Sequence, residues 1–260
     1  IGYDVANNDN NPVPPSGSFD HGTMVAGCVS ASTDNGVGIA SVGWGVKIMG
    51  INSSTEALVV TDAGDGFLAA AQMGADVINL SLGSMGSCGY WQNLVNVAYN
   101  NYGCIVVASS GNGGEDGWTN FDLHSPSSCA NVISVTATEP GDQFDCWATA
   151  GSTVDISAPG SQIRTTNVGG GYTYTQGTSF SAPIVAGAAA LLKSRYPNAS
   201  NTFIEELIID NADPISAMNG SCQGTSLVGM LGSGRLNINT SIMAGDSLQG
   251  PGLYLSLIHI

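Results

Sequence analysis

The segment from Ser179 to Arg195 constrains the fold most, because it reads as a helix that is buried on every face. After Pro183 the sequence IVAGAAALLKSR is small or apolar until its last turn. A proline in the first turn removes no helical hydrogen bond, and Lys193 and Arg195 suit the negative end of the helix dipole. A helix that is apolar all round needs protein on all sides. We therefore expect this segment at the centre of a large domain.

Short runs rich in Val and Ile alternate along the chain with longer small-residue or amphipathic runs. Such runs are typical of buried parallel strands and of the helices that connect them. The alternation predicts an α/β fold, a three-layer sandwich whose mostly parallel sheet is flanked by helices. The expected strands are residues 46–51, 77–82, 105–109, 132–136 and 154–157, and the expected helices are residues 21–32, 62–73, 91–101, 179–195 and 202–210.

The charge of the chain limits its partners. It has 20 acidic residues against 5 basic ones, a formal net charge of -15. Phosphate binding needs Lys and Arg, so we expect no nucleic-acid partner. An acidic surface suits an extracellular or salty medium, and part of it could bind cations. No apolar run reaches the length of about 18 residues that spans a bilayer, so we expect no membrane insertion.

The six cysteines allow up to three disulfides. Cys28 lies in a small-residue helical stretch, where a buried free thiol is the expected state. That leaves at most two bridges among the other five cysteines. Cys88 and Cys104 flank a predicted helix and are one candidate pair. No cysteine spacing matches a zinc site.

Three short motifs carry reactive side chains. Ser179 lies in GTSFSAP and would need a base within hydrogen-bond reach to act as a nucleophile. His21 opens the helical motif HGTMVAG, where the helix N-terminus disfavours a positive imidazolium and so favours a neutral base. Asn112, in SSGNG after an apolar strand, could donate to an oxyanion at the carboxyl end of that strand. Each residue alone also has a structural interpretation, as helix cap, helix-start residue or turn residue.

Together and in this order, these motifs resemble the subtilisin family of serine proteases (subtilases). The similarity runs from about residue 1 to about residue 245, and other matching segments include GADVINLSLG, DISAPG and GSGRLN. The resemblance implies a subtilisin-like peptidase domain over residues 1–250, with broad serine endopeptidase activity on polypeptides. It also implies a secreted monomer that needs no cofactor for its chemistry. Structural calcium occurs in the family, and the loops at residues 4–11 and 33–37 hold suitable oxygen ligands, although no specific metal ligand is assigned.

The resemblance also implies the role of each matched residue. Ser179 would attack the scissile carbonyl, His21 would take its proton and return it to the leaving amine, and Asn112 with the backbone N–H of Ser179 would hold the oxyanion. An extended peptide would add as a strand along the edge formed by Ser81, Leu82 and Gly83. One wall of the primary specificity pocket would consist of Ala108, Ser109, Ser110 and Gly111.

The aspartate of the family's triad has no match in this chain. The family carries it upstream of the histidine in a strand that ends D-T-G or D-S-G, and no such motif occurs here. Asp4, Asp9 and Asp20 precede His21, but residues 7–12 resemble the polar loop after the triad aspartate, and Asp20 would point away from the ring. We therefore expect an N-terminally truncated catalytic domain whose first strand is missing. Expressed alone, these 260 residues should fold poorly and be nearly inactive. A smaller departure is Met24, where many family members have a second histidine outside the triad.

The C-terminal end reads as foreign to the domain. The sequence LSLIHI at residues 255–260 reads as the translation of a transposon-end adapter used in sequencing libraries, and a natural apolar tail is the alternative. We expect residues 251–260 to be a non-native tail and His259 to have no function.

Other hydrolase classes fit less well. An α/β-hydrolase needs G-x-S-x-G and a histidine after the serine, whereas Ser181 stands at the place of the last glycine. A chymotrypsin-like barrel has no buried Ala-rich helix at its serine, and sedolisins use Glu where this chain has His21. The remaining alternative is a degenerate protease domain kept as a binding or scaffold module. The three intact site residues argue against it.

Overall fold

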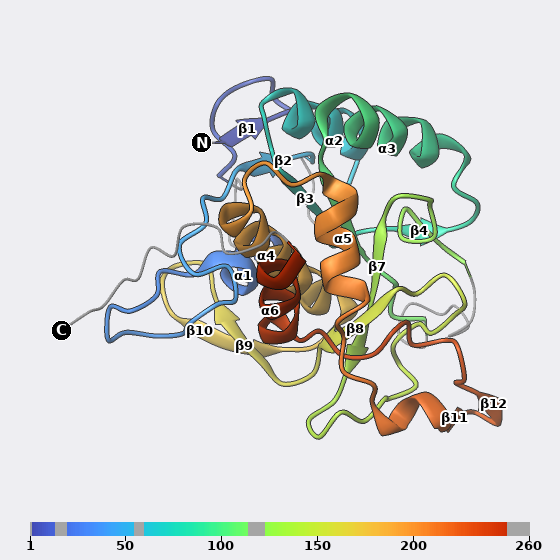
Figure 1. Cartoon of the computed structure of the whole chain (residues 1–260). Coiled ribbons are helices and arrows are strands. Elements are labelled where there is room, and N and C mark those ends of the chain that lie inside the picture. Colours follow the sequence, from blue (N-terminus) through green and yellow to red (C-terminus); the bar gives the residue numbers. More distant parts are fainter. Residues whose placement is uncertain (1, 14–19, 55–59, 114–122, 249–260) are drawn as a thin grey trace.

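The computed structural model describes residues 2–13, 20–54, 60–113 and 123–248, and these form a sheet between two layers of helices (Figure 1). The central sheet has four parallel strands in the order β3-β5-β7-β8. The strands are β3 (Val77–Leu80), β5 (Ile105–Ser109), β7 (Ile133–Thr138) and β8 (Ile156–Pro159). The predicted α/β class with a mostly parallel sheet is therefore confirmed.

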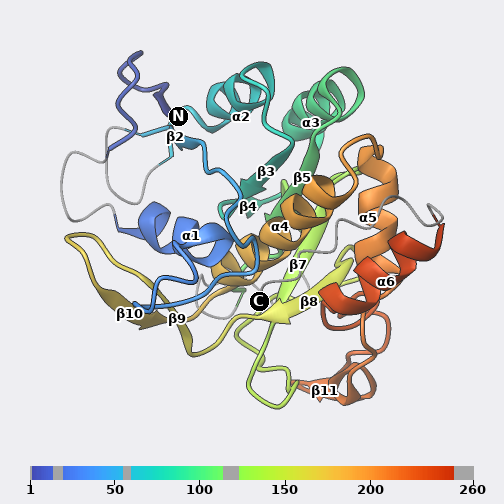
Figure 2. The same ribbon diagram turned by 60° about the vertical axis from the view of Figure 1, so that its left-hand side comes forward.

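Helices cover both faces of this sheet (Figure 2). Ile105 and Val107 of β5 point into a core shared with helix α4, and Val106 and Ala108 point into a second core under the helices of the other layer. This alternation is the two-residue period of a strand buried on both faces. The helices are α1 (His21–Ser30), α2 (Ala63–Gln72), α3 (Gly89–Tyr102), α4 (Thr178–Arg195), α5 (Asn201–Ile209) and α6 (Ile238–Leu248).

Helix α4 lies at the centre, as its sequence predicts. It packs against β3, β5, β7 and β8 on one side and against α1 and α5 on others. Its residues from Thr178 to Leu192 are mostly buried, and only the last turn with Lys193 and Arg195 reaches the surface. The run of alanines lets the surrounding elements approach the helix closely. Because the helix is buried on nearly all sides, the segment has almost no polar face.

Smaller sheets surround this core. β1 (Gly2–Asp4) pairs in parallel with β2 (Gly50–Asn52), and the hairpin β9 (Ile163–Thr166)–β10 (Tyr172–Thr175) lies beside α1. Two-residue strands form β4 (Ser84–Met85) with β6 (His124–Ser125), and β11 (Ser221–Cys222) with β12 (Thr225–Ser226), next to the 3-10 turn Ser216–Asn219. The strand expected over residues 46–51 begins only at Gly50, and the other predicted strands and helices are present with shifted ends.

The structure forms two disulfides, Cys88–Cys129 and Cys146–Cys222, and leaves Cys28 and Cys104 free and buried. The expected free thiol at Cys28 and the limit of two bridges are confirmed. The suggested pair Cys88–Cys104 is wrong. The two residues stand at opposite ends of α3, whose 14 residues span about 21 Å, whereas bridged Cα atoms lie within about 7 Å.

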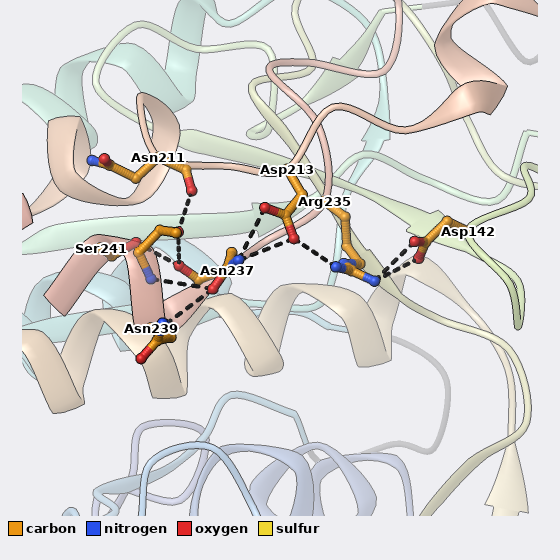
Figure 3. Close-up of polar contacts among 8 residues, drawn as sticks. Asp142, Asn211, Asp213, Arg235, Asn237, Asn239 and Ser241 are labelled. Atoms are coloured by element: carbon orange, nitrogen blue, oxygen red, sulfur yellow. Dashed lines mark hydrogen bonds and ion pairs between the residues drawn. The ribbon is translucent and has the colours of Figure 1, made fainter. Parts of the chain in front are cut away.

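A polar network ties the C-terminal part of the chain to the sheet layer (Figure 3). The Arg235 guanidinium donates to both carboxylate oxygens of Asp142, at 3.0 and 2.8 Å, and to Asp213 at 2.6 Å. Asn237 donates to both oxygens of Asp213, and the Thr240 hydroxyl donates to the carbonyl of Asn211 at 2.7 Å. The planar guanidinium fork thus joins segments that lie far apart in the sequence.

Two further expectations concern the ends and the membrane. The proposed tail at residues 251–260, including His259, lies outside the described residues. Among the described helices, none is long and apolar enough to cross a membrane.

Candidate active site

The three motif residues meet at the start of α4. Ser179 is the second residue of this helix, which begins after Gly177. Gly177 has a φ of 141°, a conformation that residues with a Cβ rarely adopt, and this sharp entry turns the chain into the helix. His21 is the first residue of α1, and Asn112 follows β5. His21 contacts Phe180, and Asn112 is hydrogen-bonded to Thr178.

Asn112 is fixed by Thr178. Its Oδ1 accepts hydrogen bonds from the backbone N–H of Thr178 at 3.0 Å and from its hydroxyl at 2.9 Å. The Thr178 hydroxyl oxygen in turn accepts from the N–H of Gly111 at 3.2 Å. Because Oδ1 is occupied twice, the amide group is oriented with Nδ2 on its other side. Among the described residues, Nδ2 has no hydrogen-bond acceptor, so this donor is available to a ligand.

Ser179 is connected to the end of β3. The hydroxyl of Ser81 donates to the Ser179 carbonyl at 2.7 Å and accepts from Nδ2 of Asn79 at 3.0 Å. The Ser179 hydroxyl makes a long contact of 3.5 Å to the carbonyl of Ser81. This weak bond leaves the hydroxyl oxygen with its lone pairs unused, as an incoming electrophile requires.

His21 lies over the same turn of α4. Its ring centroid is 5.7 Å from that of Phe180, and the two rings are tilted by 59°. Although His21 remains exposed, the protein around its ring lowers its pKa, and the carboxylate of Asp20 opposes this in part. The neutral imidazole, which can accept a proton, is therefore favoured. In the described structure the rings and not a hydrogen bond connect His21 to residues 178–180.

No described carboxylate is hydrogen-bonded to His21. Asp4 ends β1 and is buried, but its two oxygens accept from the backbone and side chain of Asn7 and from the side chain of Asn52, at 2.8 to 3.0 Å. Burial raises the pKa of Asp4, and these hydrogen bonds outweigh it and lower the pKa. Asp9 pairs through its backbone with Asp4, and Asp20 precedes the first turn of α1. Asp4 therefore anchors a loop.

The two predicted substrate-binding segments lie at the carboxyl ends of paired strands. Leu80 of β3 pairs with Ala108 of β5, and beyond this pair the chain continues as Ser81–Gly83 on one side and Ser109–Gly111 on the other. Segments that diverge from neighbouring parallel strands form the crevice where α/β proteins bind ligands. On the β5 side, the Ser110 hydroxyl donates to the carbonyl of Thr149 at 3.0 Å, so it stabilises this wall.

Sequence reasoning missed His124, which lies between these two segments. A Cβ atom at Gly83 would overlap the His124 ring, and one at Gly111 would lie 2.8 Å from its Cδ2 atom. The only signal in the sequence is that His124 is one of three histidines in a chain with few basic residues. Its local sequence, LHSPSS, shows no periodicity that would place it at a site.

The described residues contain no group of three His, Cys, Asp or Glu side chains arranged to hold a metal ion. The chemistry that the site can support comes from a serine hydroxyl, an imidazole and an amide donor that lie around one helix start. This combination suits acyl transfer, in which the hydroxyl attacks a carbonyl and the amide stabilises the resulting oxyanion.

Comparisons with known proteins agree with this geometry. A family model described as "Subtilase family" matches residues 2–238. The chain is 39% identical over 217 residues to a thermophilic serine proteinase from Bacillus sp. (strain AK1), covering 83% of this chain and 51% of that protein. It is 38% identical over 218 residues to thermitase from Thermoactinomyces vulgaris, covering 83% and 74%. An extracellular protease from Xanthomonas campestris is 33% identical and is covered over 41% of its length. The chain thus spans about half the length of the first and third of these relatives.

Solved structures are similar as well. Proteases from Pseudoalteromonas arctica PAMC 21717 align with a TM-score of 0.72 and 30% identity, over 86% of this chain and 70% of that one. The self-cleaved protease domain of PatA aligns with a TM-score of 0.73 over 97% of this chain and 90% of that one. At 24% identity, the second likeness supports the fold alone.

Proposed function

Because the chain belongs to the subtilase family, we propose that it is the catalytic domain of a serine endopeptidase that hydrolyses polypeptides. The observation that carries the proposal is the double hydrogen bond from Thr178 to Asn112 Oδ1, which leaves Nδ2 as a donor beside Ser179. A turn residue would not need its amide oriented in this way. An oxyanion hole does, because its donors must be in place before charge develops.

In the proposed reaction, the Ser179 hydroxyl oxygen attacks the scissile carbonyl carbon while the His21 imidazole takes its proton. The resulting oxyanion accepts hydrogen bonds from Asn112 Nδ2 and from the backbone N–H of Ser179. That N–H belongs to the first turn of α4, where a helix leaves N–H groups without intrahelical acceptors. The C–N bond then breaks as His21 gives its proton to the leaving amine, and a water molecule hydrolyses the acyl-enzyme by the same steps.

We propose that the triad aspartate lies on a strand that precedes these 260 residues. Three observations support this. No described carboxylate hydrogen-bonds to His21. β2, α2 and β3 follow one another, yet β2 and β3 are not paired, so the outer edge of β3 has no strand neighbour among the described residues. Asn79, on β3, has a buried Oδ1 without a hydrogen-bond partner. An additional parallel strand at this edge would supply backbone donors and bring a carboxylate near His21.

The same reasoning predicts that residues 1–260 alone are nearly inactive. In subtilisin, where the loss of the aspartate alone has been measured, it lowers kcat by roughly 10⁴-fold. The missing strand would also leave a sheet edge in the middle of the domain, which lowers stability. We use the term extended protein for these residues together with the residues that are encoded directly upstream of them.

Substrates are proposed to bind as an added strand along Ser81–Gly83, through backbone hydrogen bonds that give broad specificity. We also propose a secreted monomer. The names of two relatives, "Extracellular protease" and "Cell wall-associated protease", and the excess of acidic residues support secretion.

The chemistry needs no cofactor, and calcium would have a structural role only. In the loop at residues 4–11, both oxygens of Asp4 already accept hydrogen bonds from Asn7 and Asn52. An ion there would depend on Asp9 and on carbonyl or amide oxygens. Isothermal titration of the extended protein with calcium tests this proposal, and the absence of heat of binding would overturn it.

Comparing the extended protein with residues 1–260 tests the function. We expect hydrolysis of an unfolded protein substrate by the former, loss of hydrolysis in its Ser179→Ala variant, and almost none by the latter. A folded extended protein whose upstream region contains no aspartate near His21 and which hydrolyses nothing would favour the alternative, a degenerate domain that binds peptides without cleaving them. Robust proteolysis by residues 1–260 alone would overturn the need for an upstream aspartate.

A further inference from the structure

The imidazole of His124 fills the space between the two proposed substrate walls. Glycines face the ring from both walls: Gly83 from the segment after β3 and Gly111 from the segment after β5. His124 itself is only 6% exposed. A side chain that enters between the walls would therefore meet the imidazole.

Backbone pairing fixes His124 at this place. β6 pairs antiparallel with β4, so that Met85 is opposite His124, and β4 begins directly after Gly83. The floor between the walls is therefore built from β6, which pairs with the strand that continues one wall. This pairing joins residues about forty positions apart and positions the ring independently of the loop tips.

Hydrogen bonds also hold the ring. The Ser127 hydroxyl donates its single proton to the carbonyl of His124 at 2.7 Å. Ser127 Oγ also lies 3.3 Å from Nδ1 of His124. These two contacts restrict rotation of the ring.

A small, partly polar cavity adjoins the ring of His124. The cavity has a volume of about 30 Å³, and about half of its lining residues carry a hydroxyl group, among them Ser110, Ser134 and Thr149. This volume is enough to hold water. The Ser134 hydroxyl has no partner in the described structure, which suits such a water.

From this geometry we infer that His124 closes the primary specificity pocket and restricts cleavage to bonds that follow small residues such as Gly, Ala and Ser. The inference rests on the proposed endopeptidase function and names its substrate class. A small residue needs little depth between the walls, whereas an aromatic or long side chain would overlap the buried ring. Forcing such volume into a packed site is unfavourable.

The test uses the extended protein and two peptide p-nitroanilides that differ only in the residue before the scissile bond, Ala or Phe. We expect kcat/KM to be about tenfold or more higher for Ala. His124→Gly should lower the ratio of kcat/KM for the Ala peptide to that for the Phe peptide by about tenfold or more. The matched control His124→Phe keeps a ring of similar size and should keep the preference for Ala. His124→Ala serves as a second enlarging variant if His124→Gly does not fold.

Labelling of Ser179 with a fluorophosphonate separates the two proposals, because it requires the nucleophile but no specificity pocket. A labelled wild-type protein that prefers Phe would overturn the inference and leave the proposed function intact. A third p-nitroanilide, with Glu before the scissile bond, tests whether the ring acts through its charge. A preference for this peptide that His124→Phe abolishes would also overturn the inference, because recognition would then depend on the charge of the ring and not on its volume. A protein that neither labels nor hydrolyses would overturn both.

Discussion

Asn112 and Thr178 are joined through a single oxygen: Oδ1 of Asn112 accepts both the N–H and the hydroxyl of Thr178, at 3.0 and 2.9 Å. This relationship connects the loop after β5 to the first turn of α4. It fixes the amide donor of Asn112 near Ser179 before any substrate binds. Preorganised donors of this kind need no rearrangement when negative charge develops, which is the usual origin of their catalytic effect.

Asn112→Asp tests this arrangement in the extended protein. The substitution keeps an oxygen that can accept from Thr178 but replaces the Nδ2 donor with an acceptor. We expect kcat to fall by about 10²–10³-fold, the loss measured when the corresponding donor is removed in subtilisin, with KM changed little. Steady-state kinetics on a peptide substrate measure the effect.

Thr178→Val is the matched variant for the same relationship. It removes the hydroxyl that orients Asn112 and keeps the backbone N–H, so we expect a smaller loss in kcat, about tenfold. If kcat fell equally in Asn112→Asp and Thr178→Val and both variants had lowered melting temperatures, Asn112 would have a structural role only.

The acid limb of the pH–rate profile should report His21. The protein around its ring excludes solvent in part and lowers its pKa, and the Asp20 carboxylate raises the pKa in part. The base must be neutral, so kcat/KM should fall as the pH drops through a value below the ordinary histidine pKa of about 6.5. Asp20→Asn removes the opposing charge and should shift the limb to still lower pH.

The pH profiles of the wild type and the Asp20→Asn variant measure this shift. A limb that moves to higher pH in the variant, or that does not move, would contradict the assignment of His21 as the base. Asp34→Asn, on a distant loop, is a control for the change in net charge.

Glu205 on α5 should make stability depend on pH. Burial raises its pKa to about 7, the carboxylates of Asp155 and Glu206 add to this, and a hydrogen bond from Tyr99 opposes it. The folded pKa is above the ordinary value near 4.5, so the contribution of Glu205 to stability is fully present below that value and is lost as pH rises through about 7.

Glu205→Gln should therefore stabilise the protein by about 2 kcal/mol at pH 8 and have little effect at pH 4. Gln can still accept from Tyr99. Urea unfolding at both pH values measures the difference. A variant that is less stable than the wild type at pH 8 would contradict the account.

The parts of the fold that the sequence predicts are those with strong local patterns. β5 and α4 stand out because runs of Val, Ile or Ala leave no polar face, and both are buried in the structure. The hairpin β9–β10 and helix α6 were not predicted. Tyr and Thr alternate on the largely exposed β10, and polar residues interrupt α6, so neither shows a distinct apolar period.

Features that depend on contacts between residues far apart in the sequence could not be predicted. Cys88 bonds to Cys129 because α3 separates it from Cys104 and the fold returns the later cysteine to the start of that helix. His124 is placed by the pairing of β4 with β6, and its local sequence carries no sign of this. The three motif residues of the candidate site were identified because each lies in a distinctive local sequence at the start of a helix or the end of a strand.

The most direct test of the central claim is covalent labelling of the extended protein with a fluorophosphonate, followed by mass spectrometry of the peptide that contains Ser179. The account predicts one adduct, on Ser179, that forms much more slowly in His21→Ala and in Asn112→Asp while the melting temperatures stay close to that of the wild type. A folded protein that forms no adduct on Ser179, or forms it at the same rate in both variants, would contradict the claim that Ser179, His21 and Asn112 act together.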